Sequence, residues 1–437
     1  MSSSSQRARR GRPSRDPTGE SLELVIDDLA LTGEGVAHLP TGDAVFVPGT
    51  VDGERVRAVV GGGRPRRGRL LEVLAPSPRR VTPACALASR CGGCDFMHLA
   101  PEAQSDWHVR HVMRTLDSAL ARRGVALPAP ALHAAPAPLA YRTRARLQLR
   151  TKGRRAEVGY RPTRSHELLP VEHCAVLAPA LAPALAELAE LFAGSRGDGE
   201  ATVALGMEAK RVYDVRFSGV LADAYFSGVE RALRDGRVVG VRTWLDGARE
   251  PLVAGDPRPV VVAVDGAPLV VAPGGFAQAS DAAGAALARR VAELASEARA
   301  TRAVELFAGS GTLTVALARV VDDLVAIERD EPAVAALRDN LLARALSVRV
   351  RVGDAETTPL PRADLVVLDP PRGGAVGAVR AIASLRPRRV VYVSCNVATL
   401  ARDLETLVEA RYRPTSLDLF DVFPQTSHVE AVVALDR

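Results

Sequence analysis

The last part of the chain alternates between short apolar runs and alanine-rich stretches with helical spacing. The apolar runs are AVELFAG, DLVAIER, SVRVRVGD, ADLVVLDPP and RVVYVSC. Runs of this kind, apolar at nearly every position, are typical of parallel strands that helices cover on both faces. Residues 271–437 are therefore predicted to form an α/β domain with a mostly parallel sheet.

The region before this domain has a different pattern. Residues 21–75 contain short strand-like runs separated by glycine and proline, which predict a small antiparallel barrel. Residues 76–270 are mixed, with a helix expected near 101–123 and an Ala/Leu-rich helix around 178–194. Since 437 residues are too many for one ordinary core, we expect a barrel, a mixed α+β central domain and an α/β domain.

Charge and composition bear on partners and compartment. The formal charge is +6 and the pI about 9.3, which permits an anionic partner. Arginines crowd residues 1–20, which predicts a disordered basic arm, and they recur in GGGRPRRGRL within the barrel. No segment approaches the ~20 apolar residues of a membrane span, and no apolar signal region follows the N-terminus. We therefore expect a cytoplasmic monomer with no membrane partner.

Four of the five cysteines form one candidate metal site. Cys85, Cys91 and Cys94 are spaced C-x5-C-x2-C, and Cys174 follows eighty residues later. Thiols stay reduced in the cytoplasm, where clustered cysteines indicate metal binding or catalysis before disulfides. From the spacing, an iron–sulfur cluster and a tetrahedral zinc ion fit equally well.

A glycine-containing turn after the first strand of the α/β domain is a candidate cofactor site. In VELFAGSGTLTVALA, Gly309 and Gly311 match two positions of a dinucleotide fingerprint, but Thr314 occupies the third. Glu328 ends the next strand and could hold ribose hydroxyls, while Asp354 ends the third and could face an adenine edge. Open α/β sheets bind ligands at these strand ends. S-adenosylmethionine, which has no pyrophosphate, fits best, and NAD is the second candidate.

A thiol and two carboxylates follow at later strand ends. Asp369, in DPPR, closes the fourth predicted strand, Cys395 closes the fifth, and Glu430 precedes the last. With a methyl donor, this set suggests methylation at carbon 5 of a pyrimidine. A thiolate adds to carbon 6, and a base later removes the carbon 5 proton so that the thiol can leave. A free thiol has a pKa of about 8.5, so a nearby cation such as Arg372 would favour the thiolate. Taken alone, Cys395 also fits a small apolar cap of a buried strand.

These motifs resemble the RNA 5-methyluridine (uracil-C5) methyltransferases of bacteria over nearly the whole chain after the arm. LDPPRGG, VYVSCN and FPQTSHVE are the most specific matches. GGFAQAS is similar to the family's F-x-Q-x-N element, with Ser280 in place of the usual Asn. LFAGSGTLT is similar to its cofactor loop, VPGTVDGERV to a TRAM barrel, and CALASRCGGCDFMHL with VEHC to its cluster site.

The resemblance implies a fold, cofactors and residue roles. It implies a Rossmann-like class I methyltransferase domain with Cys395 as nucleophile, Glu430 as general base and Asp369 as a contact to cofactor and uracil. It implies that Gln278, Phe307 and Thr312 line the S-adenosylmethionine site beside the glycines and acids above. It also favours a 4Fe–4S cluster over zinc at Cys85, Cys91, Cys94 and Cys174.

The implied partner is RNA. The target uridine must leave its stack to reach such a site, and arginines of the arm and barrel can contact phosphates without reading sequence. A TRAM barrel with a cluster resembles the bacterial 23S rRNA enzymes more than the tRNA enzyme. Two alternatives stay open at this point: a non-catalytic RNA-binding iron–sulfur protein, and an amino-group methyltransferase. The latter needs no thiol and places an aromatic residue, not Arg372, after the two prolines.

Overall fold

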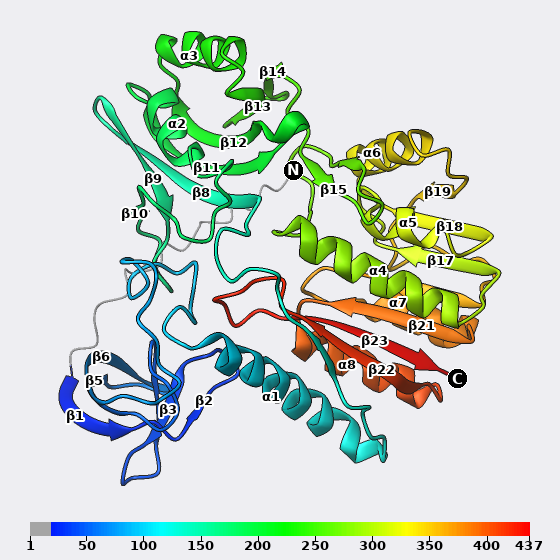
Figure 1. Cartoon of the computed structure of the whole chain (residues 1–437), viewed down its shortest axis with the longest axis horizontal. Coiled ribbons are helices and arrows are strands. Elements are labelled where there is room, and N and C mark those ends of the chain that lie inside the picture. Colours follow the sequence, from blue (N-terminus) through cyan, green and yellow to red (C-terminus); the bar gives the residue numbers. More distant parts are fainter. Residues whose placement is uncertain (1–18) are drawn as a thin grey trace, which may run out of the picture. The chain divides into compact units, whose positions relative to one another are not determined.

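The computed structural model describes residues 19–437, so the predicted basic arm lies almost wholly outside the described residues (Figure 1). The described chain divides into two compact units. One contains the residues up to Leu99 together with Tyr160–Pro170, and the other contains Ala100–Gly159 and Val171–Arg437. The predicted domain limits at residues 75 and 270 stay predictions.

The first unit is built on a β-sheet. Its strands lie in the order β1-β5-β6-β4-β3-β2. Neighbours are antiparallel except β4 and β6, which are parallel, whereas the sequence predicted antiparallel strands throughout. Alternate residues point into a core of small and branched apolar side chains. The strands are β1 (Gly19–Val25), β2 (Asp28–Leu29), β3 (Gly35–His38), β4 (Ala44–Val47), β5 (Arg55–Gly61) and β6 (Arg66–Ala75), and β10 (Leu169–Pro170) follows later.

The second unit contains a central sheet with two helices. Its strands run in the order β9-β8-β11-β12-β13-β14, with β12 and β13 parallel and the other pairs antiparallel. The elements are β8 (Arg144–Lys152), β9 (Arg155–Tyr160), α2 (Ala184–Leu191), β11 (Arg196–Leu205), η2 (Met207–Ala209), β12 (Arg211–Val220), α3 (Asp223–Arg234), β13 (Val238–Leu245) and β14 (Leu252–Gly255). A short hairpin, β15 (Val260–Val262) with β16 (Pro268–Val270), precedes the next domain.

The C-terminal sheet of the second unit has the order β19-β18-β17-β20-β21-β23-β22-β7. All its pairs are parallel except the two made by β23, which runs against its neighbours. The elements are α4 (Asp281–Glu297), β17 (Arg302–Leu306), α5 (Thr312–Leu317), β18 (Asp323–Glu328), α6 (Glu331–Leu342), β19 (Arg349–Val352), β20 (Leu365–Leu368), α7 (Val376–Leu385), β21 (Arg389–Ser394), α8 (Val397–Glu409), β22 (Arg413–Phe420) and β23 (Glu430–Asp436).

Both faces of this sheet are buried, as the apolar runs predicted. In β21, Val390 and Tyr392 join the core under α7 and α8, while Val391 and Val393 join the core under α4 and α5. Successive strand residues point to opposite faces, so a strand covered on both sides must be apolar throughout. In Figure 1, α4 crosses in front of the sheet and α8 lies behind it. The predicted Rossmann-like α/β fold class is confirmed.

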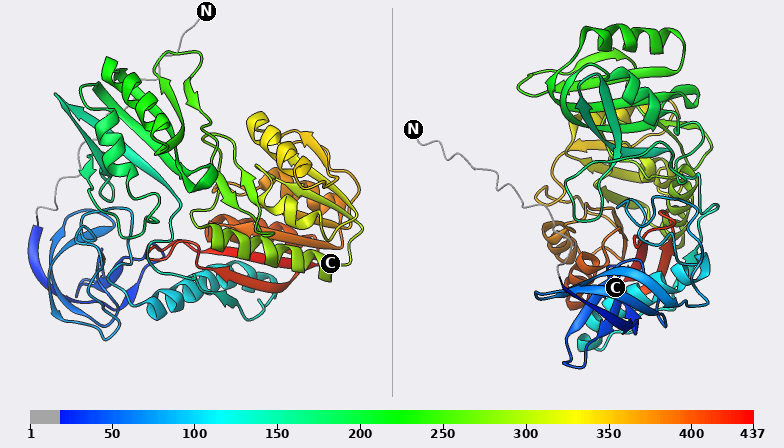
Figure 2. Two further views of the ribbon diagram at one scale, coloured as in Figure 1. Left: turned by 45° about the horizontal axis from the view of Figure 1, so that its top comes forward. Right: turned by 90° about the vertical axis from the view of Figure 1, so that its left-hand side faces the viewer.

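Two elements from the predicted central region join this sheet. Helix α1 (Pro101–Leu120), with the short η1 (Ala121–Arg123), contributes Val112, Leu116 and Leu120 to the core under α8. Strand β7 (Ala131–His133) then pairs in parallel with β22 at the sheet edge. Figure 2 shows α1 alongside the red C-terminal strands. In the described part of the chain, no helix is both long and apolar enough to cross a bilayer.

Candidate active site

The predicted catalytic residues meet at one edge of the C-terminal sheet. Strand β17 lies in the middle of the sheet. Strands β18 and β19 are added on one side of it, and β20 and β21 are added on the other side. The strand order therefore reverses between β17 and β20. Ligands bind open α/β sheets at the carboxyl ends of strands beside such a reversal. Asp369 follows β20 and Cys395 follows β21. Because β23 runs antiparallel, its first residue, Glu430, lies at the same edge.

The Cys395 thiol is half-buried between charged groups. Burial, and then the charges of Glu430 and Asp369, raise the pKa of Cys395 to about 11. The Arg372 guanidinium lowers that pKa, as expected for a neighbouring cation, but it does not outweigh the other three influences. The predicted influence of Arg372 is therefore present, but it is weaker than the influences that favour the thiol. The thiol is therefore the favoured form of Cys395, and a role as nucleophile would require it to lose its proton.

Glu430 is only 2 % exposed, and one of its carboxylate oxygens has no hydrogen-bond partner among the described residues. Burial raises the pKa of Glu430 to about 8, and the charge of Asp369 adds to the rise. A hydrogen bond with the Gln278 side chain and the charge of Arg372 partly oppose it. A carboxyl with a pKa near the working pH can both accept and release a proton, which suits a general base.

Asp369 and Arg372 are positioned through the loop that follows β20. Burial raises the pKa of Asp369 to about 7. The Arg372 carbonyl accepts hydrogen bonds from the Asn396 side-chain amide at 2.9 Å and from the Thr399 hydroxyl at 3.3 Å. Asn396 also caps the N-terminus of α8, accepting the amide of Ala398 at 3.1 Å. The DPPR loop is therefore tied to the residue that directly follows Cys395.

The cofactor turn lies between β17 and α5, as predicted. Phe307 follows β17 with a φ of 61°, an uncommon left-handed conformation for an aromatic residue. Gly309 and Gly311 also have positive φ. At Gly311 a Cβ atom would approach the Leu337 side chain to 2.5 Å, so only glycine fits there. Thr312 begins α5 at this edge.

Glu328 and Asp354 occupy the ends of the next two strands. One Glu328 carboxylate oxygen accepts the Gly309 amide at 2.9 Å, and the other accepts the amides of Arg329 and Asp330 at 2.7 and 2.8 Å. Glu328 thus ties the glycine turn to the end of β18. Asp354 lies two residues beyond β19, where it accepts the Glu356 amide at 3.0 Å.

Sequence reasoning missed Glu305. It lies inside β17, is 1 % exposed, and has one carboxylate oxygen with no hydrogen-bond partner in the part of the chain that the structure describes. Burial raises the pKa of Glu305 to about 8, and the charges of Asp369 and Glu328 add to the rise. An acid inside an otherwise apolar buried strand was the signal, because such a carboxyl needs a partner or a ligand.

The four predicted metal ligands are half-buried cysteines. Cys85, Cys91 and Cys94 belong to the first unit, and Cys174 belongs to the second. The Cys91 sulfur lies 3.4 Å from the Gly93 amide nitrogen, a contact that suits a thiolate acceptor. Across residues 19–437, no three His, Cys, Asp or Glu side chains gather into a group that could hold a metal ion. The four-cysteine site stays a prediction from the sequence.

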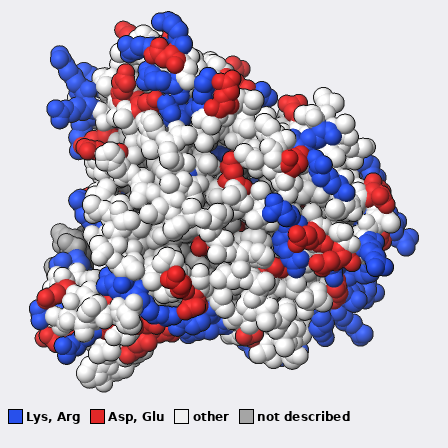
Figure 3. Space-filling model, in the orientation of Figure 1, with Lys and Arg blue, Asp and Glu red and all other residues white. Residues whose placement is uncertain are grey.

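The predicted arginine cluster of the first unit, which lies in GGGRPRRGRL, is partly exposed. Two barrel arginines are engaged in ion pairs, Arg66 with Asp43 at 3.1 Å and Arg67 with Glu34 at 2.9 Å. Arg154 and Arg155 are exposed at the turn between β8 and β9. Figure 3 shows Lys and Arg side chains gathered at its upper left, where Figure 1 places the end of the β8–β9 hairpin. Exposed arginines of this kind can contact an RNA backbone.

Two family models match parts of the chain. The model described as tRNA (Uracil-5-)-methyltransferase matches residues 361–437, and the model described as Methyltransferase small domain matches residues 267–383. The first matched range contains Asp369, Cys395 and Glu430, and the second contains the cofactor turn.

Relatives of similar length match nearly the whole chain. The 23S rRNA (uracil(1939)-C(5))-methyltransferase of Chromohalobacter salexigens is 35% identical over 99% of this chain and 92% of its own length. The enzyme of the same description from Pseudomonas syringae pv. tomato is 34% identical over 96% of this chain and 95% of its own length. An RNA methyltransferase of Caulobacter vibrioides is 33% identical over 95% of this chain and 100% of its own length.

A solved structure shares the fold. The Pyrococcus abyssi tRNA (uracil-54, C5)-methyltransferase, in complex with S-adenosyl-L-homocysteine, superposes with a TM-score of 0.75 at 21% identity. The superposition covers 95% of this chain and 100% of the Pyrococcus abyssi chain. At this identity the likeness concerns the fold alone.

Proposed function

The chain belongs to the RNA uracil-C5 methyltransferase family, and from this premise we propose that it methylates carbon 5 of one uridine in 23S rRNA. The methyl donor is S-adenosylmethionine. The observation that carries the proposal is the meeting of Cys395, Asp369 and Glu430 at the carboxyl edge of the sheet. We propose the uridine equivalent to uracil 1939 as the target, because full-length relatives are described with that specificity.

The first chemical step belongs to Cys395. Carbon 5 of uracil is a weak nucleophile, but addition of the Cys395 sulfur to carbon 6 moves the ring electrons toward carbon 5 and oxygen 4. Of the two carboxylates that raise the pKa of Cys395, Asp369 is the group that can accept its proton. S-adenosylmethionine supplies an electrophilic methyl carbon to carbon 5, which then carries both the methyl group and a proton.

The second step belongs to Glu430. Its carboxylate removes the carbon 5 proton, the electrons return to the ring, and the bond between carbon 6 and sulfur breaks. Burial holds this group in a dry site, where a proton moves without competition from water. Asp369, with a pKa raised to about 7, is suited to hold the uracil or the donor beside Cys395.

The chain offers buried polar atoms that fit the donor. One oxygen of Glu305 and the side-chain oxygen of Gln278 are buried without a hydrogen-bond partner among residues 19–437. A cationic donor with an amino group would satisfy such acceptors. We propose that these two residues, with Phe307, Thr312 and Asp354, hold S-adenosylmethionine above the glycine turn.

The proposed function predicts one missing methyl group. Deleting the gene is expected to remove 5-methyluridine from a single position of 23S rRNA, while tRNA keeps its own. Primer extension and mass spectrometry of RNase fragments would locate the loss. Restoring the gene should restore that methyl group, and restoring it with Cys395→Ala should not. A loss confined to tRNA, or no loss of 5-methyluridine, contradicts the proposal.

We also propose that Cys85, Cys91, Cys94 and Cys174 hold a 4Fe–4S cluster. The support is their spacing and their half-buried position, which suits thiolate ligation. Protein purified without oxygen should be brown, absorb near ~400 nm and contain about four irons per chain. Replacing Cys91 with serine should remove the colour, whereas Cys395→Ala should keep it. A colourless protein that binds one zinc ion would contradict this assignment.

A further inference from the structure

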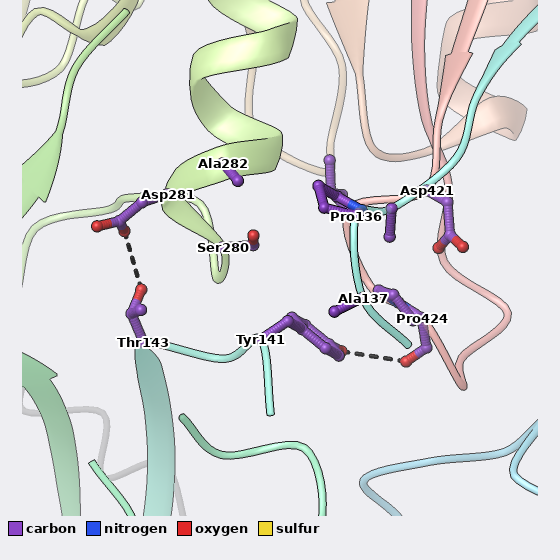
Figure 4. Close-up of a pocket in the computed structure, with 11 residues that line it drawn as sticks. Pro136, Ala137, Tyr141, Thr143, Ser280, Asp281, Ala282, Asp421 and Pro424 are labelled. Atoms are coloured by element: carbon purple, nitrogen blue, oxygen red, sulfur yellow. Dashed lines mark hydrogen bonds between the residues drawn. The ribbon is translucent and has the colours of Figure 1, made fainter. Parts of the chain in front are cut away.

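A cavity of about 230 Å³ lies in the second unit beside the predicted catalytic edge. Three segments line it: residues 135–143, the start of α4, and the loop after β22 (Figure 4). Most of its lining is apolar, with Pro136, Tyr141 and Pro424 among the walls. The Tyr141 hydroxyl donates to the Pro424 carbonyl at 3.1 Å, which fixes the ring in the wall. We call this space the Asp421 cavity.

Asp421 stands out among the groups that line the cavity. The other acidic residue in the lining, Asp281, accepts the Thr143 hydroxyl at 2.9 Å and the Val262 amide at 3.2 Å. Asp421 has one buried carboxylate oxygen with no hydrogen-bond partner among the described residues. Figure 4 draws the hydrogen bond between Asp281 and Thr143 as a dashed line. Burial raises the pKa of Asp421 to about 6, a cost that a ligand donating hydrogen bonds would offset.

The segments that form the cavity also carry catalytic groups. Ser280 lies two residues after Gln278, whose side chain interacts with Glu430. Asp421 begins the loop that ends at Glu430, and its amide donates to the His133 carbonyl at 3.0 Å. The Thr143 amide donates to the Ala279 carbonyl at 2.9 Å. A nucleotide held here would lie on the same polynucleotide as a uridine at Cys395.

The chemistry of the cavity selects a class of base. Apolar walls that include a tyrosine can pack against an aromatic ring, as in proteins that bind single-stranded RNA. A carboxylate prefers two N–H donors side by side, and guanine offers this pair on its Watson–Crick edge. Adenine and cytosine place a ring-nitrogen acceptor next to their amino group, and uracil places carbonyl oxygens on both sides of its single donor. Each of these acceptors would repel a carboxylate.

We propose that the Asp421 cavity binds a guanine base of the RNA substrate, from a nucleotide close to the target uridine. This inference rests on the proposed function and adds a specificity-determining residue to it. Asp421 would accept hydrogen bonds from the guanine N1 and N2 groups, while Tyr141 and the prolines contact the ring. The cavity would then help to select the RNA by reading one base outside the reaction itself.

The test replaces each guanosine within about ten nucleotides of the methylated uridine with inosine, which lacks only the N2 amino group. With wild-type enzyme, one replacement should lower both kcat/KM and RNA affinity roughly tenfold, the effect of one hydrogen bond to a charged acceptor. With Asp421→Asn, unmodified RNA should already show about this loss, and the same inosine should cause no further loss. Ala137→Trp, which places a large side chain at the cavity wall, should also weaken RNA binding.

Asp246→Asn, at an exposed turn between β13 and β14, is the matched control and should keep the full response to inosine. Donor affinity, measured by calorimetry, should be the same in every variant and shows that each is folded. The proposal is overturned if no inosine changes RNA affinity by more than about twofold, or if Asp421→Asn responds to inosine as wild type does. Wild-type protein that binds RNA but forms no 5-methyluridine would instead refute the proposed function, and the affinity measurements would still decide this inference.

Discussion

Cys395→Ala is expected to lower methylation of RNA by about 10⁴-fold or more, because no other group can activate carbon 5 of the uracil. Asp369 and Glu430 lie at the same edge, but a carboxylate is a far weaker nucleophile toward carbon 6 than a thiolate. Transfer of labelled methyl groups from S-adenosylmethionine to 23S rRNA measures the loss. Affinities for donor and RNA should stay within about threefold of wild type, because the substitution removes only a half-buried sulfur.

Cys395→Ser and Cys174→Ser provide the comparison for this prediction. The first keeps size and polarity but replaces the thiol with a hydroxyl of far higher pKa, and it should be as inactive as the alanine variant. The second changes a cysteine distant in sequence from the strand edge and should keep a measurable rate. Residual activity of Cys395→Ala within tenfold of wild type would exclude covalent catalysis. A product methylated on an exocyclic nitrogen would favour an amino-group methyltransferase instead.

The positions of the catalytic residues could be predicted because parallel strands constrain them. Once AVELFAG, ADLVVLDPP and RVVYVSC are recognised as buried strands, the residues at their carboxyl ends must share one edge. The structure places Asp369 and Cys395 directly after β20 and β21. Glu430 needed the family resemblance as well, because the direction of β23 does not follow from its composition.

The electrostatics of the site could not be predicted in the same way. The sequence suggested that Arg372 would lower the pKa of Cys395, yet burial and two carboxylates outweigh it. These contributions depend on distances across the strand ends, which spacing along the chain does not give. The open acceptor of Asp421 was invisible for a similar reason. Its cavity joins residues near positions 140, 280 and 420, and no local pattern links them.

The association of α1 and β7 with the C-terminal sheet was also beyond the sequence pattern. An apolar helix face at residues 101–120 shows that the helix packs on something, but not on which partner. Strand β7 has only three residues, too few for a periodic signal. The chain that leaves β7 also forms one wall of the Asp421 cavity.

Glu430→Gln is expected to trap a covalent complex between the protein and methylated RNA. The amide cannot remove the carbon 5 proton, so the bond between carbon 6 and sulfur persists after methyl transfer. Formation of the complex should not be slowed, because the substitution removes a charge that raises the pKa of Cys395. Denaturing gels should show one band that carries both the RNA label and the methyl label from the donor. Turnover should fall by at least about 10²-fold, as for loss of a general base.

The pH dependence and a double variant separate this role from a structural one. Burial raises the pKa of Glu430 to about 8, so release of wild-type product should slow as the pH falls below that value and the base becomes protonated. Complex formation by Glu430→Gln should lack this limb of the profile. Adding Cys395→Ala must remove the complex entirely, since the sulfur is its only link to RNA. The Glu430→Gln variant could instead lose turnover and give no complex with either natural or 5-fluorouridine RNA. That result would show that Glu430 acts before the methyl transfer and that another group removes the carbon 5 proton.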